Sequence, residues 1–271
     1  MKKLISIATV VAAMFAVTVQ AQNNSERLPV TLSDPAKPAL VRVSLLNGSI
    51  TVRTHAGKDV IVEGRAAERS AIPETRDGLR RIDSNRGGLT IEESGNVVTI
   101  SNQNFRGGGN IEIEVPVRTN LKLNAINGGT ILVDGVDGEI DVQNTNGNVR
   151  LVNVSGSVVA HAMNGTLFAT VREVASNKPM SFSSMNANVD VTLPPNTKAN
   201  LKIRSDNGAA YSDFEVVPRP GAPPTIEENR RGGNGRFRIE IDRTTNGTIN
   251  GGGPDIELRT FNGNVFLRKG K

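Results

Sequence analysis

The chain of 271 residues contains no cysteine, no tryptophan, a single tyrosine and two histidines. The lack of cysteine excludes disulfide bonds, cysteine-linked lipid and cysteine-ligated metals. The shortage of histidine argues against zinc hydrolases and against Ser–His–Asp catalysis, which both depend on imidazole. His55 and His161 stand alone, outside any spacing typical of metal ligands, and are expected to be ordinary surface histidines.

Aromatic residues make up only 3% of the chain. Deep carbohydrate-binding clefts usually present several aromatic rings, so this composition argues against such a cleft. The formal net charge is +5, and removal of Lys2 and Lys3 with a leader would leave 5 − 2 = +3. Such a small excess does not require a nucleic-acid partner, and it leaves acidic surface glycans and anionic lipid open as partners. Three Arg-Gly-Gly triplets resemble RNA-binding segments but lack interleaved aromatics, so we interpret them as turns and expect no nucleic acid.

The first 21 residues have the pattern of a secretory signal peptide. Lys2 and Lys3 precede a mostly apolar, uncharged run at residues 4–19, and Val19 and Ala21 occupy the positions that a signal peptidase reads. This pattern predicts cleavage between Ala21 and Gln22 and export to the periplasm or the cell exterior. A retained anchor is the alternative, but the run is short for a full span. No later run is suitable, so we expect no membrane span in the mature chain.

An Asn-Gly dipeptide followed by one residue and then Val, Ile or Leu recurs along the chain. Clear copies begin at Asn47, Asn146, Asn164 and Asn262, and looser copies begin at Asn127, Asn186 and Asn207. Repetition near 20 residues is typical of repeat architectures. Asn tolerates the left-handed conformation of a tight corner, and stacked Asn amides can form a hydrogen-bonded ladder. The Asn residues are therefore interpreted as structural.

Apolar positions also align at this spacing. A shift of 18 residues places Ile131 on Val149 and Val149 on Leu167, and a shift of 22 places Leu167 on Val189. Asn-Gly is a strong hairpin signal, but a meander of hairpins would not align these positions. Stacked coils would align these apolar positions, because each coil packs on the next. The sequence therefore predicts an all-β, single-domain, right-handed parallel β-helix or β-solenoid, with consecutive coils of about 18–22 residues.

This pattern divides the chain into three parts. Residues 1–21 are the signal peptide, residues 22–38 are a linker or N-terminal cap, and residues 39–271 form the repeat domain. Insertions near 65–86 and 218–236, rich in Arg, Gly or Pro, interrupt the domain. No segment has a convincing helical period, and residues 64–81 are expected to be an irregular loop.

Two groups of residues are candidates for chemistry. The first is an acidic cluster, Asp134, Asp137, Glu139 and Asp141, whose oxygens could bind Ca²⁺ or simply form a solvated corner. The second is the set Arg150, Asp190 and Lys202, which resembles what polysaccharide lyases and hydrolases place on an outer sheet. Charged residues on strands are ordinary, however. We therefore predict no catalytic, cofactor-binding or metal-binding residue.

Several segments resemble the bacterial putative-adhesin family of exported β-solenoid proteins, a domain of unknown function. The resemblance spans about residues 39–271. It rests on the segments 110–116, 121–128, 188–194, 205–208 and 251–265, which include Asn-Ile-Glu-Ile-Glu-Val-Pro, Asn-Val-Asp-Val-Thr-Leu-Pro and Phe-Asn-Gly-Asn-Val. It implies a β-solenoid in the envelope or outside the cell, without established catalytic residues. The insertions at 65–86 and 218–236 depart from the family pattern.

The leading hypothesis is a non-enzymatic, adhesin-like binding or scaffold module of the bacterial cell envelope, whose partner is an envelope protein or a glycan. One alternative is a polysaccharide-cleaving enzyme on the same rod. Another is a periplasmic accessory of an envelope-stress signalling system.

Overall fold

A computed structural model of the chain describes residues 26–66, 75–76, 79–80, 89–102, 109–219, 225–229, 236–240 and 244–271. The described residues form strands and turns and no helix, which confirms the all-β prediction. In this part of the chain no helix could therefore cross a membrane. The predicted signal peptide and the three Arg-Gly-Gly triplets lie outside the described residues. So does most of the predicted insertion at 65–86.

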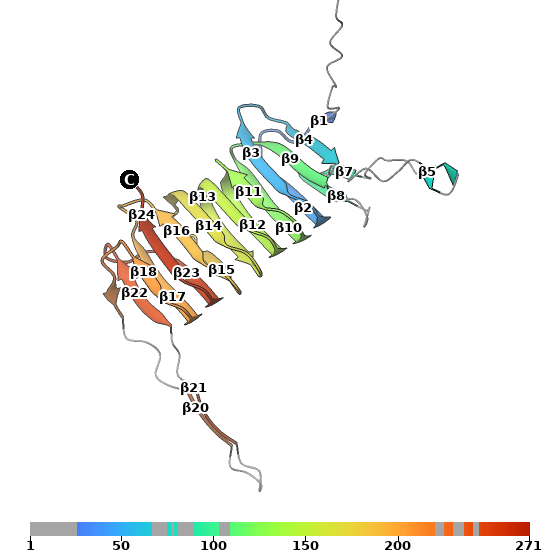
Figure 1. Ribbon diagram of the computed structural model, residues 1–271. Coiled ribbons are helices and arrows are strands. Elements are labelled where there is room, and N and C mark those ends of the chain that lie inside the picture. The colour runs from blue at the N-terminus through green and yellow to red at the C-terminus, as the bar shows by residue number, and fades with distance from the viewer. Residues whose placement is uncertain are drawn as a thin grey trace, which may run out of the picture.

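Twenty strands belong to one hydrogen-bonded sheet, which is an elongated array of two rows (Figure 1). Row A contains, in spatial order, β7 (Leu89–Ser94), β8 (Val97–Asn102), β2 (Ala39–Asn47), β10 (Thr119–Asn127), β12 (Asp137–Asn146), the second half of β13 (Val149–Ala162), β15 (Met180–Ser184), β23 (Asp255–Asn262), β17 (Ala199–Asn207), β22 (Thr245–Ile249) and β19 (Val217–Pro218).

Row B lies against row A. It contains, in spatial order, β1 (Glu26–Val30), β4 (Val60–Ala66), β9 (Gly109–Pro116), β3 (Ile50–His55), β11 (Ile131–Asp134), the first half of β13, β14 (Leu167–Val174), β16 (Val189–Leu193), β24 (Val265–Lys269) and β18 (Ala210–Ser212). Two antiparallel pairs form small separate sheets: β5 (Thr75–Arg76) with β6 (Leu79–Arg80), and β20 (Thr225–Asn229) with β21 (Arg236–Glu240).

The strand register in the middle of the array is the one that the repeat predicts. Ile131 lies opposite Val149, Val149 opposite Leu167, and Leu167 opposite Val189, all in parallel pairs. Like residues therefore stack on like residues. The aligned positions are the inward ones, because every second side chain of a strand points into the core.

Strand direction changes at both ends of the array, so the expectation of a purely parallel stack is wrong there. At one end β1, β4 and β7 run antiparallel to their neighbours, and at the other end β22 does. The β7–β8 connection is a two-residue hairpin in which Gly95 and Asn96 have φ values of 58° and 66°. Such a turn reverses the chain at once, whereas a parallel neighbour needs a long crossover. A short reversal can therefore cover an edge that a parallel stack leaves open.

The order of the strands also corrects the prediction of consecutive coils. Strands β2 and β3 lie between β8–β9 and β10–β11, and strands β23 and β24 lie between β15–β16 and β17–β18. These two pairs, β2 with β3 and β23 with β24, each lie between two other pairs of strands and not at an end of the array. We call them the tucked strands. Tucking gives these strands hydrogen-bonding partners on both edges, which strands at an open end would lack.

The core is a thin layer of aliphatic side chains between the two rows. Val41, Leu121, Ile140 and Val158 from row A are at most 2% exposed. Each such side chain contributes about 1.5–3 kcal/mol on burial. The core also contains Phe182, which is fully buried. Inward positions are therefore used for packing, and the outward positions of the rows are available for binding.

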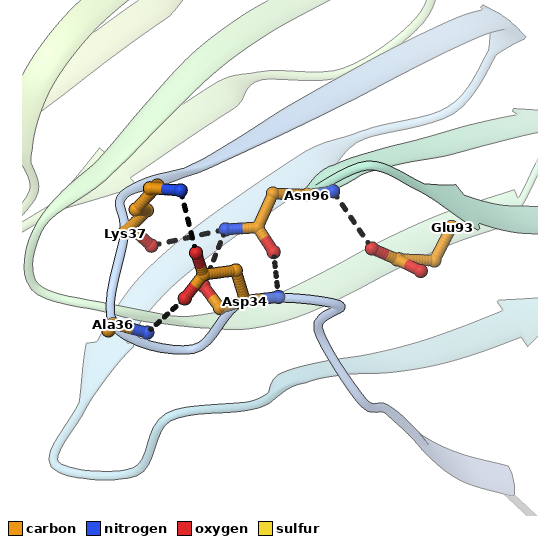
Figure 2. A network of polar contacts seen from close by, with 5 residues as sticks. All are labelled: Asp34, Ala36, Lys37, Glu93 and Asn96. Atoms are coloured by element: carbon orange, nitrogen blue, oxygen red, sulfur yellow. Dashed lines mark hydrogen bonds and ion pairs between the residues drawn. The ribbon is translucent and has the colours of Figure 1, made fainter.

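A polar network fastens the segment before β2 to the β7–β8 turn (Figure 2). The Asp34 N–H donates to Asn96 Oδ1 (2.7 Å), and Asn96 Nδ2 donates to the carbonyl oxygens of Asp34 (2.8 Å) and Lys37 (3.2 Å). Glu93 accepts hydrogen bonds from the Asn96 N–H and from Ser33. The predicted linker or cap spans residues 22–38, of which 26–38 are described. This part contains β1 and the turn at residues 33–37 that is hydrogen-bonded to the β7–β8 turn.

Candidate binding surface

The residues proposed for polysaccharide cleavage do not converge. Arg150 and Asp190 lie on the outer face of row B, whereas Lys202 lies on row A opposite Glu257. The Arg150 guanidinium lies 4.8 Å from the centre of the Phe168 ring. Asp190 accepts two hydrogen bonds from Arg268, at 2.8 and 3.0 Å. Arg150 and Asp190 therefore have separate structural contacts, and Lys202 lies on the other row.

The acidic cluster is distributed over two rows. Asp134 is on β11 of row B, Asp137 begins β12, and Glu139 and Asp141 lie further along β12 in row A. Glu139 pairs with a lysine at 3.2 Å, and Asp141 pairs with another at 3.7 Å. Among the described residues no three potential metal ligands from His, Cys, Asp or Glu come together. The cluster does not present the converging oxygens that Ca²⁺ needs.

The two histidines make local hydrogen bonds. His55 Nδ1 accepts from the Gly57 N–H at 3.0 Å, so its Nε2 is the donor to the Asp59 carbonyl oxygen at 2.8 Å. His161 Nδ1 lies 2.9 Å from Ser183 Oγ on the neighbouring strand. His161 is half-buried on the outer face of row A.

The predicted Asn ladder is present. Along one corner of the array, from the second ladder Asn onward, each Asn Nδ2 donates to the Oδ1 of the Asn before it in the spatial order given next, at 2.7–3.0 Å. The ladder consists, in spatial order, of Asn127, Asn146, Asn164, Asn186, Asn262 and Asn207. The left-handed conformation expected for these residues is wrong, because the described non-glycine residues with positive φ are Asn96, Asn153 and Asn250.

A glycine follows five of the six ladder Asn residues, and Ala187 follows the sixth, Asn186. Close packing explains why glycine is favoured at this position. A Cβ on Gly165 would collide with the carbonyl oxygen of Gly147 in the neighbouring strand layer. Backbones approach at this corner more closely than a side chain permits. The dipeptide therefore combines an amide that links the layers with a residue that lets them approach.

A second set of hydrogen bonds lies just inside this corner and was missed by the sequence reasoning. Ser184 Oγ donates to the Gly165 carbonyl oxygen (3.0 Å), and Thr260 Oγ1 donates to that of Ala187 (2.7 Å). Ser205 Oγ donates likewise to Gly263 O at 2.8 Å. Each donor stands two residues before a ladder Asn. A polar residue at that position, where the alternation calls for an apolar one, was the available signal.

An exposed apolar line runs beside the Asn ladder, and we call it the apolar stripe. It consists of Ile126, Met163, Met185 and Phe261, with Thr145 between the first two. The four apolar side chains are 38–46% exposed. Each directly precedes a ladder Asn, so the strand register that stacks the ladder also stacks the stripe. These four are a large share of the nine large hydrophobic side chains exposed in the described residues. Such clustering is typical of an interaction surface.

The stripe has hydrogen-bonding groups on both sides. The Asn ladder lies on one side. On the other side, two positions earlier on each strand, lie Asn124, Gln143, His161, Ser183 and Arg259. From Asn124 to Ser183 these groups are amides, an imidazole and a hydroxyl, without a carboxylate or a lysine. The surface is thus an apolar line between two polar, mostly uncharged lines.

The outer face of row B carries a different group of side chains. Tyr211 and Phe266 stack with ring centroids 5.3 Å apart and an interplanar angle of 12°. The Arg268 guanidinium also lies against the Phe266 ring, at 5.2 Å. The bidentate contact with Asp190 raises the pKa of Arg268 further above its ordinary value. Tyr211 and Arg268 thus each contact the Phe266 ring, which is half-buried.

Two open hollows lie elsewhere on the described surface. One, of about 360 Å³, lies on row A and is lined by residues that include Asn120, Lys122, Glu139 and Val159. The other, of about 450 Å³, lies at a different corner, near Arg172 and the glycines at 252–253. The charges of Lys122 and Glu139 in the first hollow are already paired.

Comparison with known proteins finds no matching family model and no matching curated protein. Two solved structures align with most of this chain. A putative cell adhesion protein from Clostridium sporogenes has 8% sequence identity and a TM-score of 0.48, over 91% of this chain and 100% of that one. A putative adhesin from Bacteroides fragilis has 11% identity and a TM-score of 0.24, over 90% of this chain and 95% of that one.

Proposed function

We propose that this chain is an exported, non-enzymatic, adhesin-like binding module of the bacterial cell envelope. In this proposal the two rows are the faces of a right-handed parallel β-solenoid, whose regular part winds through residues 119–193. The parallel pairs there, with partners 17–22 residues apart, support the winding. The right hand is the one that crossovers between parallel strands prefer.

The observation that carries the proposed function is the apolar stripe. A line of exposed apolar side chains costs solubility, so its presence indicates a use at the surface. The line extends across five neighbouring strands of a rigid sheet, which suits many weak contacts to one extended ligand. By contrast, Arg150, Asp190 and Lys202 do not meet, and Arg150 and Asp190 contact other residues.

Affinity capture from envelope fractions tests this function. The immobilised mature chain is expected to retain an envelope component, and the double substitution Met163→Lys and Met185→Lys is expected to abolish retention. Val159→Lys is the matched control, because Val159 lies on β13, four residues before Met163, and is 49% exposed away from the stripe. Equal retention by all three proteins would contradict the role of the stripe.

Two further measurements bound the proposal. Deletion of residues 218–236 tests whether that insertion adds selectivity, and unchanged capture would remove it from the binding surface. Incubation of the chain with a broad polysaccharide panel and added Ca²⁺ is expected to release no reducing ends. Release of oligosaccharides would identify an enzyme instead.

A further inference from the structure

We infer that the apolar stripe, with its two polar flanks, is a binding site for a linear, uncharged glycan that lies across the strands. This inference rests on the proposed function and names the ligand class of the same surface. It is carried by the periodicity of the stripe, the hydrogen-bonding groups beside it and its place on a sheet face.

The periodicity fits a polymer of rings. Each of the five strands adds one ladder amide, and four of them add an apolar stripe residue, whereas β12 adds Thr145. Strands are spaced about 4.8 Å apart. A linear glycan likewise repeats one motif, in which C–H groups cover the ring faces and hydroxyls project from the ring edges. Ring faces can lie on Met163, Met185 and Phe261 while the hydroxyls reach the polar lines. The same weak contact is thus made again at each strand.

The flanking groups fit uncharged hydroxyls. Each internal ladder amide uses one N–H and its oxygen within the ladder, which leaves a second N–H and an oxygen lone pair to project outward. Gln143 is exposed on the opposite flank. An acidic glycan would need cations along its whole length. Of the five flanking positions opposite the ladder, the last, Arg259, carries a fixed positive charge. A neutral glycan therefore matches better than an acidic one.

Other occupants fit less well. An extended peptide binds sheets through a strand edge, where backbone groups are unpaired, and the stripe lies on a face. A second copy of the chain would need about 20–30 residues a side, far more than one line of side chains. An amphipathic helix keeps its own backbone bonds but would leave the amides of the ladder without partners.

Titration with oligosaccharides of increasing length tests the inference. The probes are β-1,4-linked glucose and β-1,4-linked N-acetylglucosamine oligomers of two, four and six units, measured by calorimetry. For at least one series the affinity is expected to rise about tenfold or more from two units to six, because each added ring meets another strand. Phe261→Ser and Met185→Lys should each abolish the gain with length, whereas Val159→Lys should leave it unchanged.

Methionine oxidation gives a test that needs no substitution. Peroxide transfers an oxygen atom to the thioether sulfur and leaves as water, which makes the side chain polar. Met163 and Met185 are 38% and 46% exposed and should oxidise, whereas Met180 is 2% exposed and should not. The loss of glycan binding should then follow the sulfoxide fraction at the two exposed positions in mass spectra.

The outcomes separate this inference from the proposed function. If the glycan affinity is unchanged in the stripe variants, or does not increase with the length of the oligomer, the inference is wrong. Capture of an envelope protein or an amphipathic peptide, with no glycan bound, also overturns it while the proposed function stands. If nothing is captured from envelope fractions and no oligomer binds, both fail.

Discussion

At the residue scale, the corner that carries the Asn-Gly dipeptides is held by two lines of side-chain hydrogen bonds. The outer line is the Asn ladder, which is exposed. The inner line consists of hydroxyl groups such as those of Ser184 and Thr260, which are buried and donate to carbonyl oxygens of the turns. A buried acceptor is costly to leave unpaired, so the inner line should matter more for stability than the outer one.

The substitution Thr260→Val tests the inner line. It keeps the shape but removes the donor to the Ala187 carbonyl oxygen, so the free energy of unfolding should fall by about 1–3 kcal/mol. Thr192→Val, at a half-buried outward position on β16, is the control and should change stability by less than about 0.5 kcal/mol. Urea denaturation measures both. Equal effects would show that the buried hydrogen bond is not what stabilises the corner.

The outer line predicts a graded effect. Asn186→Ala breaks two ladder bonds, to Asn164 and from Asn262, whereas Asn207→Ala at the end of the ladder breaks one. At about 0.5–1.5 kcal/mol for each bond, and less where water competes, the first substitution should cost roughly twice as much as the second. Thermal unfolding monitored by circular dichroism can rank the two variants. The reverse order would argue against a cooperative ladder.

At the element scale, chain reversals cover one end of both rows and the other end of row A, whereas row B ends there in the parallel strand β18. Strand β1 covers β4, and β7 folds back on β8. The edge strand β1 contains Pro29, and the edge strand β19 contains Pro218. Proline lacks an N–H, which makes an edge a poor template for another strand. These elements favour a separate molecule over end-to-end fibres.

The network between residues 33–37 and the β7–β8 turn predicts a pH dependence. Hydrogen bonds from Lys37 and the Ala36 N–H lower the pKa of Asp34 below 3.8, and hydrogen bonds from Ser33 lower the pKa of Glu93 below 4.5. A lowered pKa in the folded state means that the ionised form stabilises the fold above the unfolded-state pKa. This stabilisation is therefore lost as the pH falls below about 4.5 and through the lowered values.

Amide hydrogen exchange at Asp34 and Asn96 should consequently accelerate between about pH 5 and pH 3, relative to the intrinsic rate. In the Glu93→Gln variant this acceleration should be smaller, because one of the two titrating carboxylates is gone. Amides of β12, far from the network in the array, serve as the internal reference. An identical pH profile in the variant would rule Glu93 out as a contributor.

At the scale of the whole molecule, the tucked strands tie the C-terminus into the array. Strands β23 and β24 lie between neighbours on both sides and are paired with β15, β16, β17 and β18. Removal of residues 253–271 should therefore release β17, β18 and β22, since β17 and β22 alone form only a marginal two-stranded unit. Exchange protection should be lost at residues 199–212 and 245–249 and kept at residues 119–162.

The matched control for this truncation replaces residues 220–243 with a two-residue Gly-Asn turn. The flanking residues are adjacent, because the Arg219 N–H donates to the Asn246 carbonyl oxygen at 2.9 Å. Strands β20 and β21 form their own small sheet, so their removal should leave the protection of the main array intact. Protection of residues 199–212 in the truncated chain would instead support winding in simple sequence order.

Much of the middle of the array could be read in advance. The alternation of apolar residues and the alignment of Ile131, Val149 and Leu167 predicted the strands, their parallel pairing and the ladder. The stripe was not predicted, although each of its members directly precedes a ladder Asn. The residue type alone does not tell whether a Met or Ile side chain is exposed or buried. The contact of Tyr211 with Phe266 was also missed, since it depends on which distant strands are neighbours.

By itself the sequence determined the all-β class, the period of 18–22 residues and the identity of the ladder residues, because these depend on local alternation and on the chemistry of Asn and Gly. The tertiary structure alone decided the spatial order of the strands. Asn262 lies between Asn186 and Asn207 although it is last in the chain. Apolar side chains of similar shape can stack in any order. The apolar repeat in the sequence is therefore compatible with several spatial orders of the strands. The requirement that end strands find partners on both edges favours the tucked order, and that requirement is met only in the assembled array.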